Sequence, residues 1–84
     1  MYLHIGGDVV VPKYELVAII DLTANDAAPV LKEFVQLASN EGNLWETKKE
    51  GKNKSLVITI GRVFLSTISA TTLSKRARSS NFAF

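Results

Sequence analysis

Short apolar runs, each closed by a glycine, a proline or a polar turn, constrain this chain more than any other feature. The longest unbroken run, Leu16–Ile20, has five residues, far short of the ~20 that cross a bilayer as a helix. Short runs rich in β-branched residues are typical of strands. We therefore expect an α+β fold with a small antiparallel or mixed sheet of about five to six short strands, one central helix and a short C-terminal helix.

The first half of the chain predicts a hairpin followed by a third strand. Tyr2–Ile5 and Val9–Val11 are expected to pair across a tight turn at Gly6-Gly7-Asp8, because glycine adopts positive φ at no steric cost. Leu16–Ile20 is predicted to be a buried strand. A helical segment is the alternative, since periodicity does not separate the two in so short a run.

The second half predicts a brief strand, a polar loop and another hairpin. Leu44–Thr47 is the brief strand, and residues 48–54 form a loop that turns at glycine. Ser55–Ile60 and Val63–Ile68 are expected to pair antiparallel. Their link, Gly61-Arg62, has glycine first, which is the pattern of a type II′ turn.

One long helix is predicted between a proline and a glycine. Pro29 suits a first helical turn, where its missing N–H costs nothing, and Asn25 or Asp26 is the expected cap. Gly42 is expected to end the helix as its C′ residue. The apolar stripe that we expect to face the core consists of Val30, Phe34, Leu37 and Ala38.

A second, shorter helix is predicted over Ala70–Arg78, with Ser69 as its cap and with Leu73 and Ala77 turned inward at i, i+4 spacing. Residues 79–84 are expected to form a flexible tail. The sequence contains no internal repeat and no linker, so residues 1–84 are predicted to be a single domain.

The charges are distributed unevenly along the chain. Residues 1–47 carry two bases and seven acids, a net charge of −5, whereas residues 48–84 carry eight bases and one acid, a net charge of +7. A basic half favours an anionic partner. The alternative is a dipolar protein whose two halves attract each other on folding.

Residues that catalyse reactions or bind metals are scarce. The chain has no cysteine and one histidine, His4, which lies in a predicted strand and lacks a partner. No phosphate-binding glycine motif and no paired carboxylates occur. We therefore expect neither an enzyme nor a cofactor or metal site. The N-terminus has no basic segment and reaches Asp8 early, so we expect no signal peptide, no membrane association and a cytoplasmic location.

Two basic clusters are the candidate binding residues. A loop turned by glycine can present lysines to phosphates, although a solvated hairpin loop also contains lysines. Cations at the end of a helix can contact phosphate or can simply complement the helix dipole. The candidate DNA-binding residues are Lys48, Lys49, Lys52 and Lys54 in the loop, with Arg76 and Arg78 at the helix end.

Three aromatic residues complete the candidates. Trp45 lies beside the loop and could stack on a base, although packing in a core or an interface is the more frequent role of tryptophan. Phe82 and Phe84 lie in the expected tail, where they are plausible contacts with a neighbouring subunit.

A pattern spread over almost the whole chain matches a known family, without one sharp motif. The matching segments are Met1–Asp8 with Val9–Val11, then Leu16–Asp21, Ala24-Asn25, Pro29, Phe34, Lys54–Thr59 and Thr72–Ala77. Together these segments resemble the extracellular matrix regulatory family, RemA and RemB, with the closer match to RemB.

The resemblance implies a bacterial DNA-binding regulator of biofilm matrix genes. RemA-type proteins are similar in fold to LytTR-type DNA-binding domains and assemble as rings that present basic loops to DNA. Their loop carries two bases after a glycine; here Lys52 matches the first base, Asn53 replaces the second, and Lys54 follows one position later. A further RemA arginine aligns with Glu15, and Lys13 is the nearest base.

We therefore expect a transcriptional regulator that binds double-stranded DNA as a ring-like homo-oligomer. The alternative is a structural protein that oligomerises, or that assembles with a RemA-like paralogue, without contacting DNA. The replacements at Asn53 and Glu15 favour this alternative.

Overall fold

The computed structural model describes residues 1–23 and 28–78 and confirms the α+β class. Six strands form two sheets, a two-stranded sheet β1-β2 and a four-stranded sheet in the order β3-β5-β6-β4. The elements are β1 (Tyr2–Gly6), β2 (Val9–Pro12), the short 3-10 helix η1 (Lys13–Glu15), β3 (Leu16–Asp21), α1 (Ala28–Asn40), β4 (Leu44–Glu46), β5 (Ser55–Thr59), β6 (Arg62–Ser66) and α2 (Ala70–Arg78).

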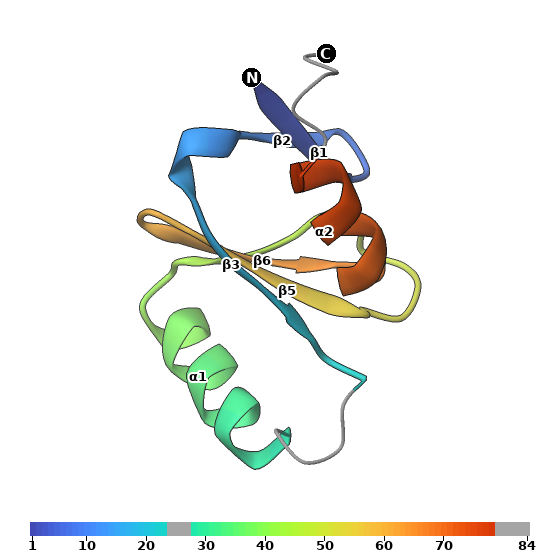
Figure 1. Cartoon of the computed structure of the whole chain (residues 1–84). Helices are drawn as coiled ribbons and strands as arrows, with labels where there is room; N and C mark the ends of the chain where they lie inside the picture. Colours follow the sequence, from blue (N-terminus) through green and yellow to red (C-terminus); the bar gives the residue numbers. More distant parts are fainter. Residues whose placement is uncertain (24–27, 79–84) are drawn as a thin grey trace.

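The four-stranded sheet is the middle of three layers. Figure 1 shows α1 on one face of this sheet, and α2 with the β1–β2 hairpin on the other. Side chains alternate between the faces along the central strands, so Val57 and Phe64 pack toward the hairpin and α2, whereas Leu56 and Val63 pack toward α1. The core is therefore divided into two clusters by the sheet.

The pairing of the strands agrees with most of the predicted pattern. β5 pairs antiparallel with β3 on one side and with β6 on the other, whereas β4 pairs parallel with β6. Residues 16–21 form a strand and not a helix. The prediction that this strand is buried was wrong, because β3 lies at an edge of the sheet and its side chains are half-buried or exposed.

Of the two predicted hairpin turns, the structure confirms the first and differs from the second. β1 and β2 pair antiparallel, with positive φ at Gly6 and Gly7, as predicted. The β5–β6 turn is shifted by one residue, because Thr59 pairs with Arg62 and leaves Ile60-Gly61 as the two central residues. Only the second of these, Gly61, has positive φ (+84°), whereas a type II′ turn needs positive φ at the first. The predicted turn type was therefore wrong.

The end of α1 is as predicted. Gly42 has φ +76°, and its N–H donates to the Ser39 carbonyl at 3.1 Å. The Asn43 N–H donates to the Ala38 carbonyl at 2.9 Å. These two bonds are the Schellman pattern with glycine at C′. The predicted caps Asn25 and Asp26 lie outside the described residues.

The buried face of α1 differs from the predicted stripe. Ala38 is buried as expected, but the other residues that pack on the sheet are Leu31 and Val35. The three remaining members of the predicted stripe are exposed, namely Val30, Phe34 and Leu37. Both sets have helical spacing, so the sequence pattern alone did not identify the side that meets the sheet.

The second helix is as predicted. The Ser69 hydroxyl accepts a hydrogen bond from the Thr72 N–H at 3.2 Å, which is an N-cap. Leu73 is fully buried, and Ala77 packs against the same cluster. Of the helices in the described part of the chain, none has the length and apolar character needed to cross a membrane.

Candidate nucleic-acid interface

The lysine loop, residues 48–54, joins β4 to β5 and is held at both ends. The Thr47 N–H donates to the Leu65 carbonyl at 3.0 Å, and the Lys54 N–H donates to the Ser66 carbonyl at 2.8 Å. Gly51 turns the loop with φ +96°, as predicted. The four lysine side chains of the loop are exposed: Lys48, Lys49, Lys52 and Lys54.

The β1–β2 turn supports the start of this loop. A Cβ atom added to Gly7 would lie 2.3 Å from the Thr47 carbonyl oxygen, so the two backbones touch. The turn and the loop enclose a shallow hollow, which places Lys48 opposite His4 and Asp8. Residues 4–8, far from the loop in sequence, therefore form part of its surroundings.

Arg76 of α2 binds the same hairpin. Its Nη1 donates to the His4 carbonyl oxygen at 3.1 Å and lies 3.5 Å from His4 Nδ1. His4 Nε2 lies 2.8 Å from the Gly7 carbonyl oxygen. Arg76 therefore contacts His4, which lines the same hollow as Lys48, so one residue of the helix cluster reaches the hairpin that borders the lysine loop. No signal in the sequence identified this role of His4.

Arg78 lies on another side of α2. It lines a hollow with Ser74 and Ala77 and with residues 16–19 of β3. Two positions along an α-helix correspond to roughly 200° of rotation, so Arg76 and Arg78 point in nearly opposite directions. The structure does not bring Arg78 together with the lysine loop. The prediction that Arg78 contacts DNA stays a prediction.

An acidic group lies beside the end of the lysine loop. The Leu22 N–H donates to the Lys54 carbonyl at 3.0 Å, and the neighbouring Asp21 ends β3. Hydrogen bonds from the hydroxyl and then from the N–H of Thr23 lower the pKa of the Asp21 carboxyl. This side chain therefore keeps a negative charge near the loop.

The two replaced family positions have different surroundings. Asn53 Nδ2 donates to Glu46 Oε2 at 3.4 Å, and among the described residues Asn53 Oδ1 is buried without a partner. Glu15 lies next to the β5–β6 turn, where its carbonyl accepts from the Ile60 N–H at 2.9 Å. Figure 1 shows this turn at the opposite end of the sheet from the loop, roughly 20 Å away for six residues of strand. Glu15 is therefore too distant to repel a phosphate at the loop.

Trp45 is not a core residue. Its side chain is 53% exposed, and the Arg62 guanidinium lies 5.7 Å from the ring centre, a cation–π distance. Stacking on a base and packing in an interface therefore remain the two predicted roles of Trp45.

Within residues 1–23 and 28–78, no three His, Cys, Asp or Glu side chains are grouped so that they could hold a metal ion.

Comparison with known proteins agrees with the family that the sequence resembles. The model of the RemA-like family, described as extracellular matrix regulatory protein A-like, matches residues 2–77. A Bacillus subtilis protein, extracellular matrix regulatory protein B, is 35% identical over 78 residues, which cover 93% of this chain and 91% of the relative. Both names are those of regulatory proteins and not of enzymes.

Proposed function

The chain belongs to the RemA-like family of extracellular matrix regulatory proteins, and from this premise we propose that it is a DNA-binding transcriptional regulator. It binds the backbone of double-stranded DNA as a ring-like homo-oligomer. The contact residues on each subunit are Lys48, Lys49, Lys52, Lys54 and Arg76. The similarity to LytTR-type domains and the cytoplasmic location are parts of the same proposal.

The observation that carries the proposal is the anchored lysine loop, which borders a hairpin that Arg76 also contacts. The loop is fixed at Thr47 and Lys54 by backbone hydrogen bonds, which reduces the conformational entropy that its backbone loses on binding. Arg76 is held by a hydrogen bond to the His4 carbonyl of that hairpin. Lysine and arginine contacts to phosphate position a protein on DNA without reading its sequence.

The proposed oligomer compensates for the small number of contacts on each subunit. With at most the five contact residues named above, one subunit is expected to bind in the non-specific range, with a dissociation constant of ~10⁻⁴–10⁻⁶ M. Several linked subunits raise the overall affinity through effective concentration. Specificity for a promoter would then come largely from the shape and curvature of the DNA.

The proposal is tested by removing two charges from the loop. We expect Lys52→Ala combined with Lys54→Ala to weaken DNA binding at least tenfold, or ~1.4 kcal/mol, because every subunit loses both contacts. Both side chains are exposed, so the melting temperature should hardly change. Fluorescence anisotropy with a labelled duplex at ~50 mM salt measures the affinity.

The matched control is Lys32→Ala with Lys75→Ala, which removes the same charge from exposed positions on α1 and α2. This control should bind nearly as the parent does. Equal losses in the two double variants would mean that net charge, and not the lysine loop, governs binding.

The second candidate is a structural protein that assembles with itself or with a RemA-like paralogue without contacting DNA. Asn53 favours it, because the residue in place of the second loop base hydrogen-bonds Glu46. A parent that forms an oligomer but shows no DNA binding at low salt would support this candidate against the first.

A further inference from the structure

The outer face of α1 is apolar and has no partner within the described part of the chain. Val30, Phe34 and Leu37 are 71%, 37% and 56% exposed, respectively. Their i, i+4, i+7 spacing places them in one stripe beside the buried stripe of the same helix. Three large apolar side chains in one exposed stripe indicate an interaction surface.

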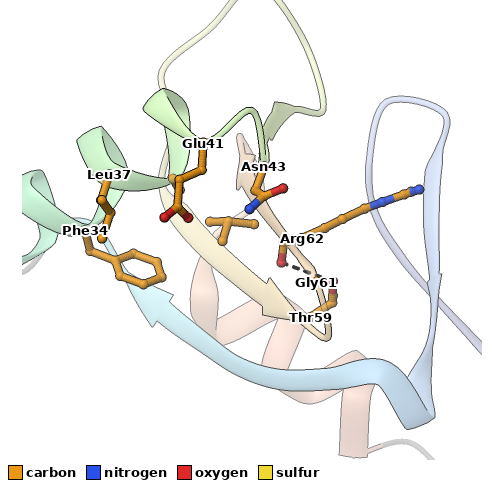
Figure 2. A pocket seen from close by; sticks show the side chains of 9 residues that line it. Phe34, Leu37, Glu41, Asn43, Thr59, Gly61 and Arg62 are labelled. Carbon is orange, nitrogen blue, oxygen red and sulfur yellow. Dashed lines mark hydrogen bonds between the residues drawn. The ribbon is translucent and has the colours of Figure 1, made fainter.

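Acidic residues flank this stripe. Helical geometry places Glu33 beside the stripe. Glu41 follows the last turn and lines a hollow with Phe34 and Leu37. Figure 2 shows Phe34 and Glu41 projecting from the α1 side toward this hollow, while the Arg62 side chain extends away from α1. The exposed face of α1 is therefore an apolar ridge with negative charge at its end.

A surface of the opposite character lies between β3 and α2. The hollow there is lined by apolar residues 16–19, with Arg78 as its charged group. Val17 is 63% exposed and lies at the irregularity where β3 slips in register against β5. β3 is also an edge strand, paired only with β5 among the described strands. This surface combines an apolar hollow with a positive charge.

We propose that the α1 ridge of one copy of this chain docks in the β3–α2 hollow of a second copy. Phe34 and Leu37 then cover Val17 and its neighbours, and Glu41 lies near Arg78. Within the described residues, neither Glu41 nor Arg78 has an ion-pair partner in its own chain. This inference rests on the proposed homo-oligomer and names the surfaces that form it.

The arrangement fixes the type of assembly. The two surfaces differ and lie on opposite faces of the central sheet. A contact between unlike surfaces is heterologous, so each copy keeps one free surface until a ring closes or a chain extends. The lysine loop is part of neither surface, so it stays accessible in the assembly.

The first test changes the ridge. We expect Leu37→Lys to weaken self-association at least tenfold, because it places a charge at the centre of the apolar contact. The new lysine lies one turn from Glu33 and from Glu41, which supports the helix. Ser39→Lys adds the same charge at an exposed position away from the ridge and should associate like the parent. Sedimentation velocity over a concentration series gives the mass of each variant.

The second test exchanges the charges. Glu41→Arg and Arg78→Glu should each weaken association at least tenfold, whereas the double variant, or an equal mixture of the two single variants, should recover to within about threefold. Circular dichroism melts establish that each variant is folded.

The remaining outcomes overturn the inference in different ways. A parent that is monomeric at micromolar concentration overturns both this inference and the proposed oligomer. An oligomeric parent that Leu37→Lys leaves unchanged overturns this inference alone. If deletion of residues 79–84 lowers the number of subunits in the assembly and Leu37→Lys does not, the hollow receives the C-terminal segment and not α1.

Discussion

A single buried hydroxyl, that of Ser66, joins three parts of the fold, and its removal is the most informative stability test. The hydroxyl donates to the carbonyl oxygen of Ile5, at the bulge in β1. It also accepts from the Ile68 N–H at 3.0 Å, just before α2. Ser66 is fully buried. Ser66→Ala therefore leaves one backbone acceptor and one backbone donor without this partner.

The expected cost follows from these two bonds. A buried polar group left without a partner costs about 1–3 kcal/mol, so we expect Ser66→Ala to lower the free energy of unfolding by about 2–4 kcal/mol. For a domain of this size, each kcal/mol lowers the melting temperature by roughly 4–8 °C. The hairpin that carries His4 and Gly7 should loosen as a result.

Ser55→Ala is the matched control. Ser55 is also fully buried, but its hydroxyl makes one bond, to the Ile68 carbonyl at 2.7 Å. Its loss should cost about 1–2 kcal/mol. Thermal unfolding by circular dichroism, at equal subunit concentration, measures both variants. A loss for Ser66→Ala that does not exceed the loss for Ser55→Ala would refute the assignment of Ser66 as the link between hairpin and sheet.

Two further changes test the surroundings of the lysine loop. Gly7→Ala should lower the free energy of unfolding by about 1–3 kcal/mol or more, because Gly7 has φ +53° and the new Cβ would lie 2.3 Å from the Thr47 carbonyl oxygen. Gly42→Ala is the control, because Gly42 has φ +76° but nothing lies within 4 Å of its added Cβ. This control should lose less stability in the same thermal melt. Because the pKa of Asp21 is lowered on folding, the Asp21 carboxylate stabilises the fold at pH values above its ordinary pKa of 3.8. This stabilisation is lost as the pH falls through the lowered pKa. Thr23→Val should raise the pKa of Asp21 toward that ordinary value, and an unchanged pKa in an NMR titration would contradict the assigned cause.

Features fixed by neighbouring residues could be predicted from the sequence. The N-cap at Ser69 and the C′ glycine at Gly42 depend on bonds within one turn of each helix, and the β1–β2 turn depends on two adjacent glycines. These caps and this turn depend on residues close together in the sequence, so a local pattern is enough to predict them.

Features fixed by contacts distant in sequence could not be predicted. Whether Leu31 or Val30 faces the sheet depends on how α1 lies across it, because both residues belong to apolar stripes of similar spacing. The 3-10 turn at residues 13–15 lies between β2, in the two-stranded sheet, and β3, in the four-stranded sheet, and no pattern in the sequence marked this division. The bond from Arg76 to His4 spans 72 positions. No pattern in either segment indicates that bond.

The salt dependence of DNA affinity tests the central claim most directly. Phosphate contacts act by releasing counterions, so affinity should fall steeply between ~50 and ~200 mM salt. The slope for the parent should be steeper than the slope for Lys52→Ala with Lys54→Ala, because the variant releases fewer counterions. Parallel slopes for the two proteins, affinity that stays flat over this range, or the absence of binding by the parent at the lowest salt would contradict the claim that the lysine loop binds the DNA backbone.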